Sequence, residues 1–262
     1  MPRKPRWTQV NSAEHGLLTV ELSSWKYFHD YVRQRTLPYS HFVWRGQRDS
    51  SWKLETTLDR QLKGKPRNSR ERLVESHLQE FKYGSRGRRA PQAAAIADEN
   101  DWWALGQHNG LSTPLLDWTE SPFVALYFAF EKAEKPPSGF RSVWALGYVE
   151  RINHAVRTAH AGDDRPPILE YIRPFQEDNS RLVNQSGLFT RVPLGTTVDD
   201  WVTSNFAGTP GNYALLQMRI PDQERLDCLR TLNRMNINHK TLFQDLYGSA
   251  EHCNKKLDIA RY

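Results

Sequence analysis

The stretch LLDWTESPFVALYFAFEKAE, residues 115–134, constrains the fold of this chain more than any other segment. Leu115–Trp118 reads as a short strand. Ser121 can cap a helix, and Pro122 is favoured at a first helical position, where its missing N–H would be unpaired in any case. The helix that follows, residues 123–133, is apolar on nearly every side at first, which places it in the core. The segment therefore predicts a strand that leads into the start of a buried helix.

Other segments predict further elements around this core. Helical spacing of apolar residues predicts helices over residues 24–35, 70–81, 222–235 and 250–257. Runs with β-branched and aromatic residues predict strands over residues 41–46, 142–150, 187–193 and 213–221. The helices group early and late around the strands, which favours an α+β fold with a mixed, mainly antiparallel sheet and flanking helices. We expect a basic flexible arm over residues 1–20 and one domain over residues 21–262.

The charge balance favours an anionic partner. The chain has 36 Lys and Arg against 30 Asp and Glu, a formal net charge of +6 and an isoelectric point near 9.3. Several of the cations cluster in KGKPRNSRERL and KYGSRGRRAPQ. Such a surface raises the local concentration of polyanions, of which nucleic acid is the commonest. A solvated basic surface that keeps the protein soluble explains the same balance.

Several classes of protein are not indicated. No run approaches the ~18 to 20 apolar residues of a membrane span, and the first residues lack the apolar core of a signal peptide. We therefore expect a cytoplasmic protein without a membrane partner. Two cysteines, Cys228 and Cys253, suggest neither a disulfide framework nor a thiolate zinc site, and the nine histidines show no ligand spacing, so we expect no metal. The chain also lacks a P-loop, a dinucleotide-binding glycine fingerprint, GxSxG and HExxH.

Three polar residues could carry chemistry. Arg45 ends an apolar strand-like run and is followed by a glycine. A guanidinium there offers several fixed donors to a phosphate, although a salt bridge that closes the strand end explains it as well. His108 and Asp117 lie nine residues apart around a loop and could form an acid/base pair or a substrate clamp. Alternatively, Asp117 pairs with Arg45 or caps the helix, and His108 binds loop backbone.

Four blocks of the chain resemble the FRG domain, a bacterial and phage family named after its Phe-Arg-Gly motif. They are FVWRGQ (42–47), GQHNGLSTPLLDWTESPFVALYFAF (106–130), RLVNQSGLF (181–189) and INHKTLFQDLYG (237–248). Trp44 stands where the family has its name-giving phenylalanine. The blocks keep the family's order. Because the family occurs near mobile elements and defence genes, the resemblance implies a toxin or phage-defence effector, with a neutralising partner protein.

A second resemblance is to toxin-like ADP-ribosyltransferases. They carry an aromatic-Arg-Gly strand, then a Ser-Thr-Ser strand end that enters an Ala-containing helix, then a Gln or Glu at a later strand. Arg45 with Gly46, Thr119 with Ser121, and Gln185 follow that order. The resemblance implies an ADP-ribosyltransferase-like core with NAD as the cofactor. It also implies that Gly46 lets the backbone approach the nicotinamide and that the two hydroxyls order the pocket.

Gln185 is neutral at the position where the transferases have their catalytic Glu. The transferase Glu bonds the ribose 2′-hydroxyl and stabilises the oxocarbenium charge, and a neutral amide offers less electrostatic stabilisation. This leaves open binding without turnover, or another carboxylate such as Asp117 or Glu177 in the same role. Thr119 and Ser121 also read as simple helix caps, and Gln185 as a turn residue.

The leading hypothesis is an NAD-dependent ADP-ribosyltransferase-like effector that modifies a nucleic acid or protein acceptor. We assign catalysis to Arg45, Gln185, Asp117 and His108, and cofactor binding to Trp44, Arg45, Gly46, Gln47, Thr113, Thr119, Ser121 and Tyr127. One alternative is a non-catalytic module that binds a nucleotide or nucleic acid. Another is a metal-independent nuclease that uses His108 and Asp117 with His239 and Asp245.

Overall fold

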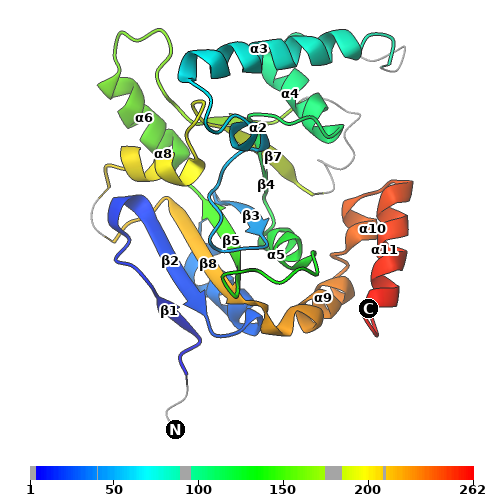
Figure 1. Ribbon diagram of the computed structural model, residues 1–262. Helices are drawn as coiled ribbons and strands as arrows, with labels where there is room; N and C mark the ends of the chain where they lie inside the picture. The colour runs from blue at the N-terminus through cyan, green and yellow to red at the C-terminus, as the bar shows by residue number, and fades with distance from the viewer. Residues whose placement is uncertain (1–3, 40, 89–95, 175–184, 209–210) are drawn as a thin grey trace.

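The computed structural model describes residues 4–39, 41–88, 96–174, 185–208 and 211–262 (Figure 1). In this part of the chain eight strands form one mixed sheet in the order β1-β2-β8-β5-β3-β4-β7-β6. The strands are β1 (Trp7–Gln9), β2 (Leu17–Leu22), β3 (Val43–Gln47), β4 (Leu116–Thr119), β5 (Phe140–Leu146), β6 (Glu170–Ile172), β7 (Gly187–Arg191) and β8 (Leu215–Pro221). Neighbours are antiparallel except β2 and β8, which are parallel. The expected α+β class with a mixed, mainly antiparallel sheet is confirmed.

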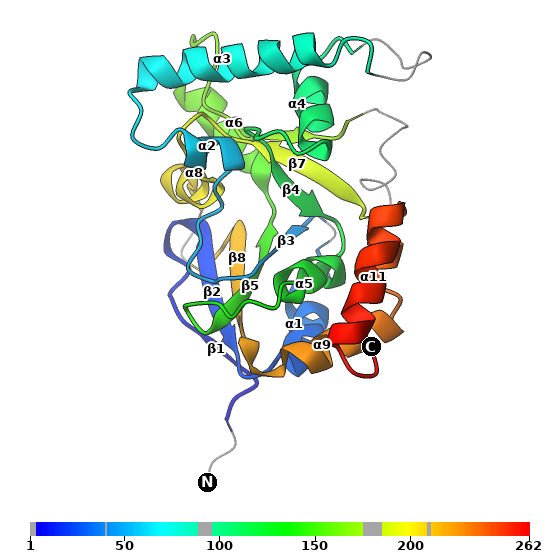
Figure 2. The same cartoon turned by 45° about the vertical axis from the view of Figure 1, so that its right-hand side comes forward.

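Helices cover both faces of the sheet. They are α1 (Phe28–Tyr31), α2 (Thr57–Gln61), α3 (Arg67–Gly84), α4 (Glu99–His108), α5 (Pro122–Phe130), α6 (Val149–Ala159), α8 (Val198–Asn205), α9 (Arg225–Arg234), α10 (His239–Leu242) and α11 (Leu246–Asp258). One core lies between the sheet and α1, α5 and α9, and a second between the other face and α6 and α8. A third core joins α2, α3 and α4 to β6 and β7, at the end of the molecule where α3 lies (Figure 2).

Helix α5 forms as its sequence predicts. The Ser121 hydroxyl accepts a hydrogen bond from the Val124 N–H at 3.4 Å, and Pro122 occupies the first helical position. Most of the helix is buried, namely Val124 to Tyr127, Ala129 and Phe130. It packs across β3 and β5, so the chain passes from β4 directly into the core.

Most of the other expected elements also form. The segment 24–35 is helical, although it is split into a 3-10 turn (Trp25–Tyr27), α1 and a π-helical turn (Val32–Thr36). The helices expected over 70–81, 222–235 and 250–257 correspond to α3, α9 and α11, and the strands expected over 41–46, 187–193 and 213–221 to β3, β7 and β8.

The expected N-terminal arm is wrong for the described residues from Trp7 onward. Strand β1 pairs with β2, and β2 pairs with β8, so this segment belongs to the sheet. Leu18, Val20 and Leu22 are buried in the core beneath α1 and α5. The prediction of an arm followed from the basic residues at the first positions and overlooked the apolar residues of β2.

The strand expected over 142–150 is too long at its C-terminal end. It stops at Leu146, because Tyr148 adopts a left-handed backbone conformation (φ 55°) that turns the chain into α6. Among the described residues no helix is long and apolar enough to cross a membrane.

Candidate functional site

A cleft of about 940 Å³ opens beside Arg45, and we call it the Arg45 cleft. Its described walls come from β3, the segment that follows β3 as far as α2, the end of β4 and the end of α5, with Gln185 and Phe243 closing one side. Strands β3 and β4 pair only at Trp44 and Thr119. Because that ladder is so short, side chains from both strands can face the same space.

Arg45 reaches across this gap toward β4. Its Nη1 donates to the Asp117 backbone carbonyl at 2.7 Å and lies 3.5 Å from Asp117 Oδ2. The side chain is 23% exposed, and Nε is buried without a hydrogen-bond partner among the described residues. Burial lowers the pKa of the Arg45 guanidinium, and Asp117 opposes that effect. An arginine has so high an ordinary pKa that the group stays charged, and one of its donors remains unused.

Cations outnumber carboxylates in the described lining of the cleft. The cations are Arg45, Arg48, Lys53, Arg60, Lys63 and Lys132, against Glu55, Asp117 and Glu131. Arg60 donates to the Glu55 carbonyl at 2.7 Å and to Thr57 Oγ1 at 3.2 Å, and it forms no salt bridge within the described chain. Its charge is near enough to lower the pKa of Arg45 further. Two guanidinium charges in the lining of one cleft therefore repel each other, and a bound anion would offset that repulsion.

An exposed aromatic ring stands in the same cleft. Trp52 is 44% exposed, and the guanidinium carbon of Arg48 lies 5.0 Å from its ring centroid. Large apolar rings at the surface are a common part of ligand sites, because they offer a flat face for stacking. A planar heterocycle next to an anionic group fits this combination.

Asp117 is held from behind by a short chain of hydrogen bonds. Gln107 Nε2 donates to Asp117 Oδ1 at 2.7 Å, and the Thr113 hydroxyl donates to Gln107 Oε1. Thr113 is buried and does not line the cleft, so it orients Asp117 through Gln107. His108, the last residue of α4, does not line the cleft either.

The structure gathers seven of the residues assigned from the sequence around the Arg45 cleft. They are Trp44, Arg45, Gly46, Gln47, Asp117, Thr119 and Gln185. His108, Thr113, Ser121 and Tyr127 are not in its lining. Glu177 lies outside the described residues.

Several of these side chains already have structural partners. Thr119 Oγ1 donates to the Gln185 backbone carbonyl, which ties β4 to the start of β7. The Gln185 amide donates to the Leu242 carbonyl at 3.2 Å, and Ser121 caps α5. Tyr127 is buried, with its hydroxyl 3.0 Å from Nδ1 of His239.

Gly46 packs against the backbone of α5, whereas the resemblance to the transferases implies a nicotinamide next to this glycine. A Cβ on Gly46 would lie 1.9 Å from the Ala125 carbonyl oxygen and 2.5 Å from the Ala129 nitrogen. The space that the missing side chain leaves is therefore filled by the backbone of α5. Close packing of β3 and α5 explains this glycine.

Glu131, Trp52 and Arg60 line the cleft but were not predicted as site residues from the sequence. Glu131 lines the cleft with its side chain 10% exposed, and Oε1 lies 3.6 Å from Nδ1 of His239. Burial lowers the pKa of His239, which favours its neutral form. Trp52 lies in the irregular segment after β3 and Arg60 in the short helix α2, and no local pattern distinguishes their side chains in a cleft from side chains on open surface.

Comparison with protein families matches residues 40–137 to the FRG domain. The match includes the blocks 42–47 and 106–130, and the blocks 181–189 and 237–248 fall outside it. Gln185 and Phe243 nevertheless line the cleft together with residues inside the match. Comparison with the curated proteins and with the solved structures gives no significant match.

Proposed function

The chain contains an FRG domain at residues 40–137, and we propose that the Arg45 cleft of this domain binds a nucleotide through its phosphates. One observation carries the proposal: Arg45, whose buried Nε has no partner among the described residues, shares with Arg60 a cleft whose lining has more cations than carboxylates.

A phosphate would satisfy both arginines at once. Arginine donors match phosphate oxygens in a planar, paired geometry, and such charge-assisted bonds are about twice as strong as neutral ones. Each contributes roughly 1.5–3 kcal/mol, because the alternative is a buried donor without a partner. The carbonyl of Asp117 fixes Arg45 in place, so little side-chain entropy is lost when the ligand binds.

The size and the aromatic content of the cleft favour a nucleotide over a free phosphate. A volume of about 940 Å³ falls near the upper end of the range of roughly 300–1,000 Å³ for small-molecule sites. Trp52 offers an exposed ring on which a base or a nicotinamide can stack. A dinucleotide with a pyrophosphate uses the cations and the ring together.

The finer proposal is that the nucleotide is NAD and that the protein transfers ADP-ribose. Its support is that Arg45, Thr119 and Gln185 line one cleft although they are far apart in sequence. Along the chain they follow the order of the transferase motifs. In the reaction the glycosidic bond to nicotinamide breaks with its electron pair on the leaving group. An acceptor nucleophile then bonds to the ribose carbon and loses a proton.

A carboxylate of the cleft would stabilise the developing charge. Glu131 and Asp117 are both in the lining, and Asp117 is exposed enough to take a proton from the acceptor. The acceptor, the toxin or phage-defence role, the cytoplasmic location and the neutralising partner stay predictions.

A non-catalytic nucleotide-binding module is the second candidate, and Gln185 favours it. Its neutral amide is bonded to the Leu242 carbonyl and offers no negative charge at the position of the transferase Glu. Incubation with labelled NAD and mixed acceptors separates the two: label transfer or nicotinamide release supports the enzyme, and binding without either supports the module. The nuclease alternative gains no observation, because His108 is not in the lining and His239 is buried.

Replacement of Arg45 by alanine tests nucleotide binding. We expect R45A to weaken the binding of both NAD and ADP-ribose by about tenfold or more, because each charge-assisted bond to phosphate contributes roughly 1.5–3 kcal/mol. Arg45 makes one short hydrogen bond, to the Asp117 carbonyl, so the expected loss of stability is about 1 kcal/mol, or roughly 2–4 °C. Isothermal titration and thermal unfolding measure the two effects.

The matched control is R157A, which removes an exposed arginine from α6 that is not in the cleft. It should bind both ligands as the unsubstituted protein does. If neither ligand binds the unsubstituted protein, or if R45A binds them equally well, the cleft is not a nucleotide site. A large loss of stability with unchanged affinity would give Arg45 a purely structural role.

A further inference from the structure

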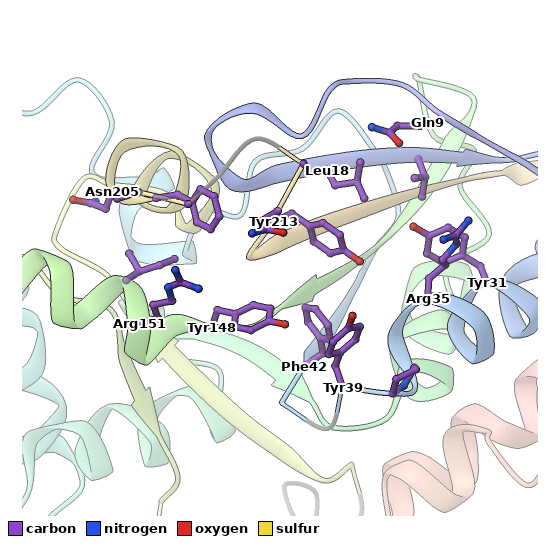
Figure 3. A pocket seen from close by; sticks show the side chains of 18 of the residues that line it. Gln9, Leu18, Tyr31, Arg35, Tyr39, Phe42, Tyr148, Arg151, Asn205 and Tyr213 are labelled. Atoms are coloured by element: carbon purple, nitrogen blue, oxygen red, sulfur yellow. The ribbon is translucent and has the colours of Figure 1, made fainter.

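A second cavity, of about 900 Å³, lies at the other end of β3, and we call it the aromatic cleft (Figure 3). Phe42, immediately before β3, lines it, whereas Trp44 to Gln47 line the Arg45 cleft. We propose that the aromatic cleft binds single-stranded nucleic acid, with bases against its tyrosines and phosphates at Arg35 and Arg151. This inference does not depend on the function proposed for the Arg45 cleft.

Aromatic side chains form most of the apolar wall. They are Trp7, Tyr31, Tyr39, Phe42, Tyr148, Phe206 and Tyr213. Tyr39 and Tyr148 are 48% and 39% exposed, so their rings are accessible rather than packed away. Every base has a π-face, and stacking on exposed aromatic rings is the usual way in which proteins bind single strands without regard to sequence.

The charges of the aromatic cleft have one sign. Its described lining holds Arg35, Arg151 and His154 and no carboxylate, in contrast to the three carboxylates of the Arg45 cleft. Within the described chain neither Arg35 nor Arg151 forms a salt bridge, so both charges are available to a ligand. Aromatic rings beside uncompensated arginines are complementary to a base with its phosphate.

The backbone holds Tyr148 in a costly conformation at the rim of this cleft. Its φ of 55° lies in the left-handed region that a residue with a bulky side chain rarely adopts. Its ring centroid lies 4.2 Å from that of His41 and 6.2 Å from that of Phe42, both edge-on, which fixes the direction of the ring. Strain that persists around an exposed aromatic side chain is typical of a binding site.

The placement of the two arginines favours a strand over a single nucleotide. Figure 3 shows Arg35 and Arg151 toward opposite sides of the cleft, with Tyr148 and Tyr213 between them. A mononucleotide carries phosphate on one side of its sugar, whereas each sugar within a strand has a phosphate on both its 5′ and its 3′ side. Burial raises the pKa of Tyr213, and the nearby Tyr39 and Tyr148 add to this effect, so its hydroxyl stays protonated and can donate to the strand.

Fluorescence anisotropy with a labelled oligo-dT strand tests the proposal on the full chain. We expect Y148A to weaken binding by about tenfold, because it removes a stacking surface, and Y148F to bind within about twofold of the unsubstituted protein. The double variant R35Q/R151Q should reduce the slope of log affinity against log salt by about 1.4, since each phosphate contact on a single strand contributes roughly 0.7.

A matched double variant separates the site from general attraction. R33Q/R157Q removes two exposed arginines from the same two elements, the π-helical turn and α6, and neither residue lines the cleft. It should leave the affinity and the salt slope nearly unchanged. R45A should also leave oligo-dT binding unchanged, which keeps this result distinct from that of the Arg45 cleft. Thermal unfolding of each variant confirms that it is folded.

Several outcomes would overturn the proposal. They are no binding of oligo-dT at low salt, equal weakening by the two double variants, and full affinity in Y148A. Binding of thymidine monophosphate as tight as that of oligo-dT would assign the cleft to a free nucleotide instead. Tighter binding of the matching duplex than of the single strand would also contradict it, because paired bases cannot stack on the tyrosines.

Discussion

Gly46 and Arg45 are neighbours on β3 with opposite surroundings. Arg45 faces the cleft and bonds to Asp117, whereas the position of a Cβ on Gly46 is taken by the backbone of α5. The arginine and the glycine therefore have different roles, and the role of the arginine depends on the packing that the glycine allows. The glycine brings α5 against β3, and this packing fixes the strand from which Arg45 projects.

Replacement of Gly46 by alanine should strongly destabilise the fold. The new Cβ would lie 1.9 Å from a carbonyl oxygen in the middle of α5, and backbone cannot swing aside as a flexible side chain can. We expect a loss of about 3 kcal/mol or more in the free energy of unfolding, at or above the usual range for overpacking. Urea unfolding followed by circular dichroism measures it.

The control for this substitution is G84A in α3. A Cβ on Gly84 would meet nothing within 4 Å, and alanine is favoured over glycine in helices, so stability should stay equal or rise by roughly 0.5 kcal/mol. Full stability of G46A would show that β3 and α5 are not packed as described.

At the scale of elements, the turn from β4 into α5 organises the Arg45 cleft. Asp117 and Thr119 come from β4, and Glu131 immediately follows α5. Ser121 stands between them, with its hydroxyl on the Val124 N–H, so its observed role is to start the helix. Of the two hydroxyl residues that match the transferase pattern, Thr119 lines the cleft and Ser121 does not.

Substitution of Ser121 separates capping from ligand binding. We expect S121A to lower the free energy of unfolding by about 1 kcal/mol, the usual cost of losing a helix cap, with unchanged affinity for nucleotides. S121T keeps a capping hydroxyl and should recover most of that stability. Thermal unfolding and isothermal titration give the two readouts. If S121A lost nucleotide affinity but kept full stability, Ser121 would be a binding residue rather than a helix cap.

At the scale of the whole molecule, the N-terminal strands complete both the sheet and the aromatic cleft. Trp7 of β1 packs edge-on against Tyr31 with 5.3 Å between ring centroids, and both line the cleft. Leu18 and Val20 of β2 line it too. The N-terminal strands, whose composition resembles that of a flexible arm, therefore form one wall of a cavity whose other walls include the segments before β3 and before β8.

Replacement of Trp7 by alanine tests this role of the N-terminus. We expect W7A to cost about 1–2 kcal/mol in stability, less than the roughly 3–5 kcal/mol for a fully buried aromatic, because Trp7 is half-buried. Binding of oligo-dT should weaken as well. W52A, which removes a more exposed ring, should lose less stability. Equal stability of W7A and the unsubstituted protein would mean that β1 does not hold the sheet edge.

The sequence by itself determined the elements whose signals are local. The cap at Ser121, the Pro at the first turn and the apolar run after it predict α5 without reference to the rest of the chain, and the structure confirms it. The strand that ends near Arg45 follows from its aromatic and β-branched content in the same way. Most long helices were predictable because the spacing of apolar residues within one segment indicates a helix. The order of helices and strands along the chain then indicated the α+β class.

Only the tertiary structure decided which side chains share a cleft and which structural roles Gly46, Thr119 and Ser121 have. Trp52, Arg60 and Glu131 join Arg45 because three separate segments converge around one end of β3, and no spacing along the chain encodes that convergence. Strand β2 belongs to the sheet through its pairing with β8, almost two hundred residues away along the chain. Contacts between distant segments depend on packing and chain closure, and local residue patterns carry little record of either.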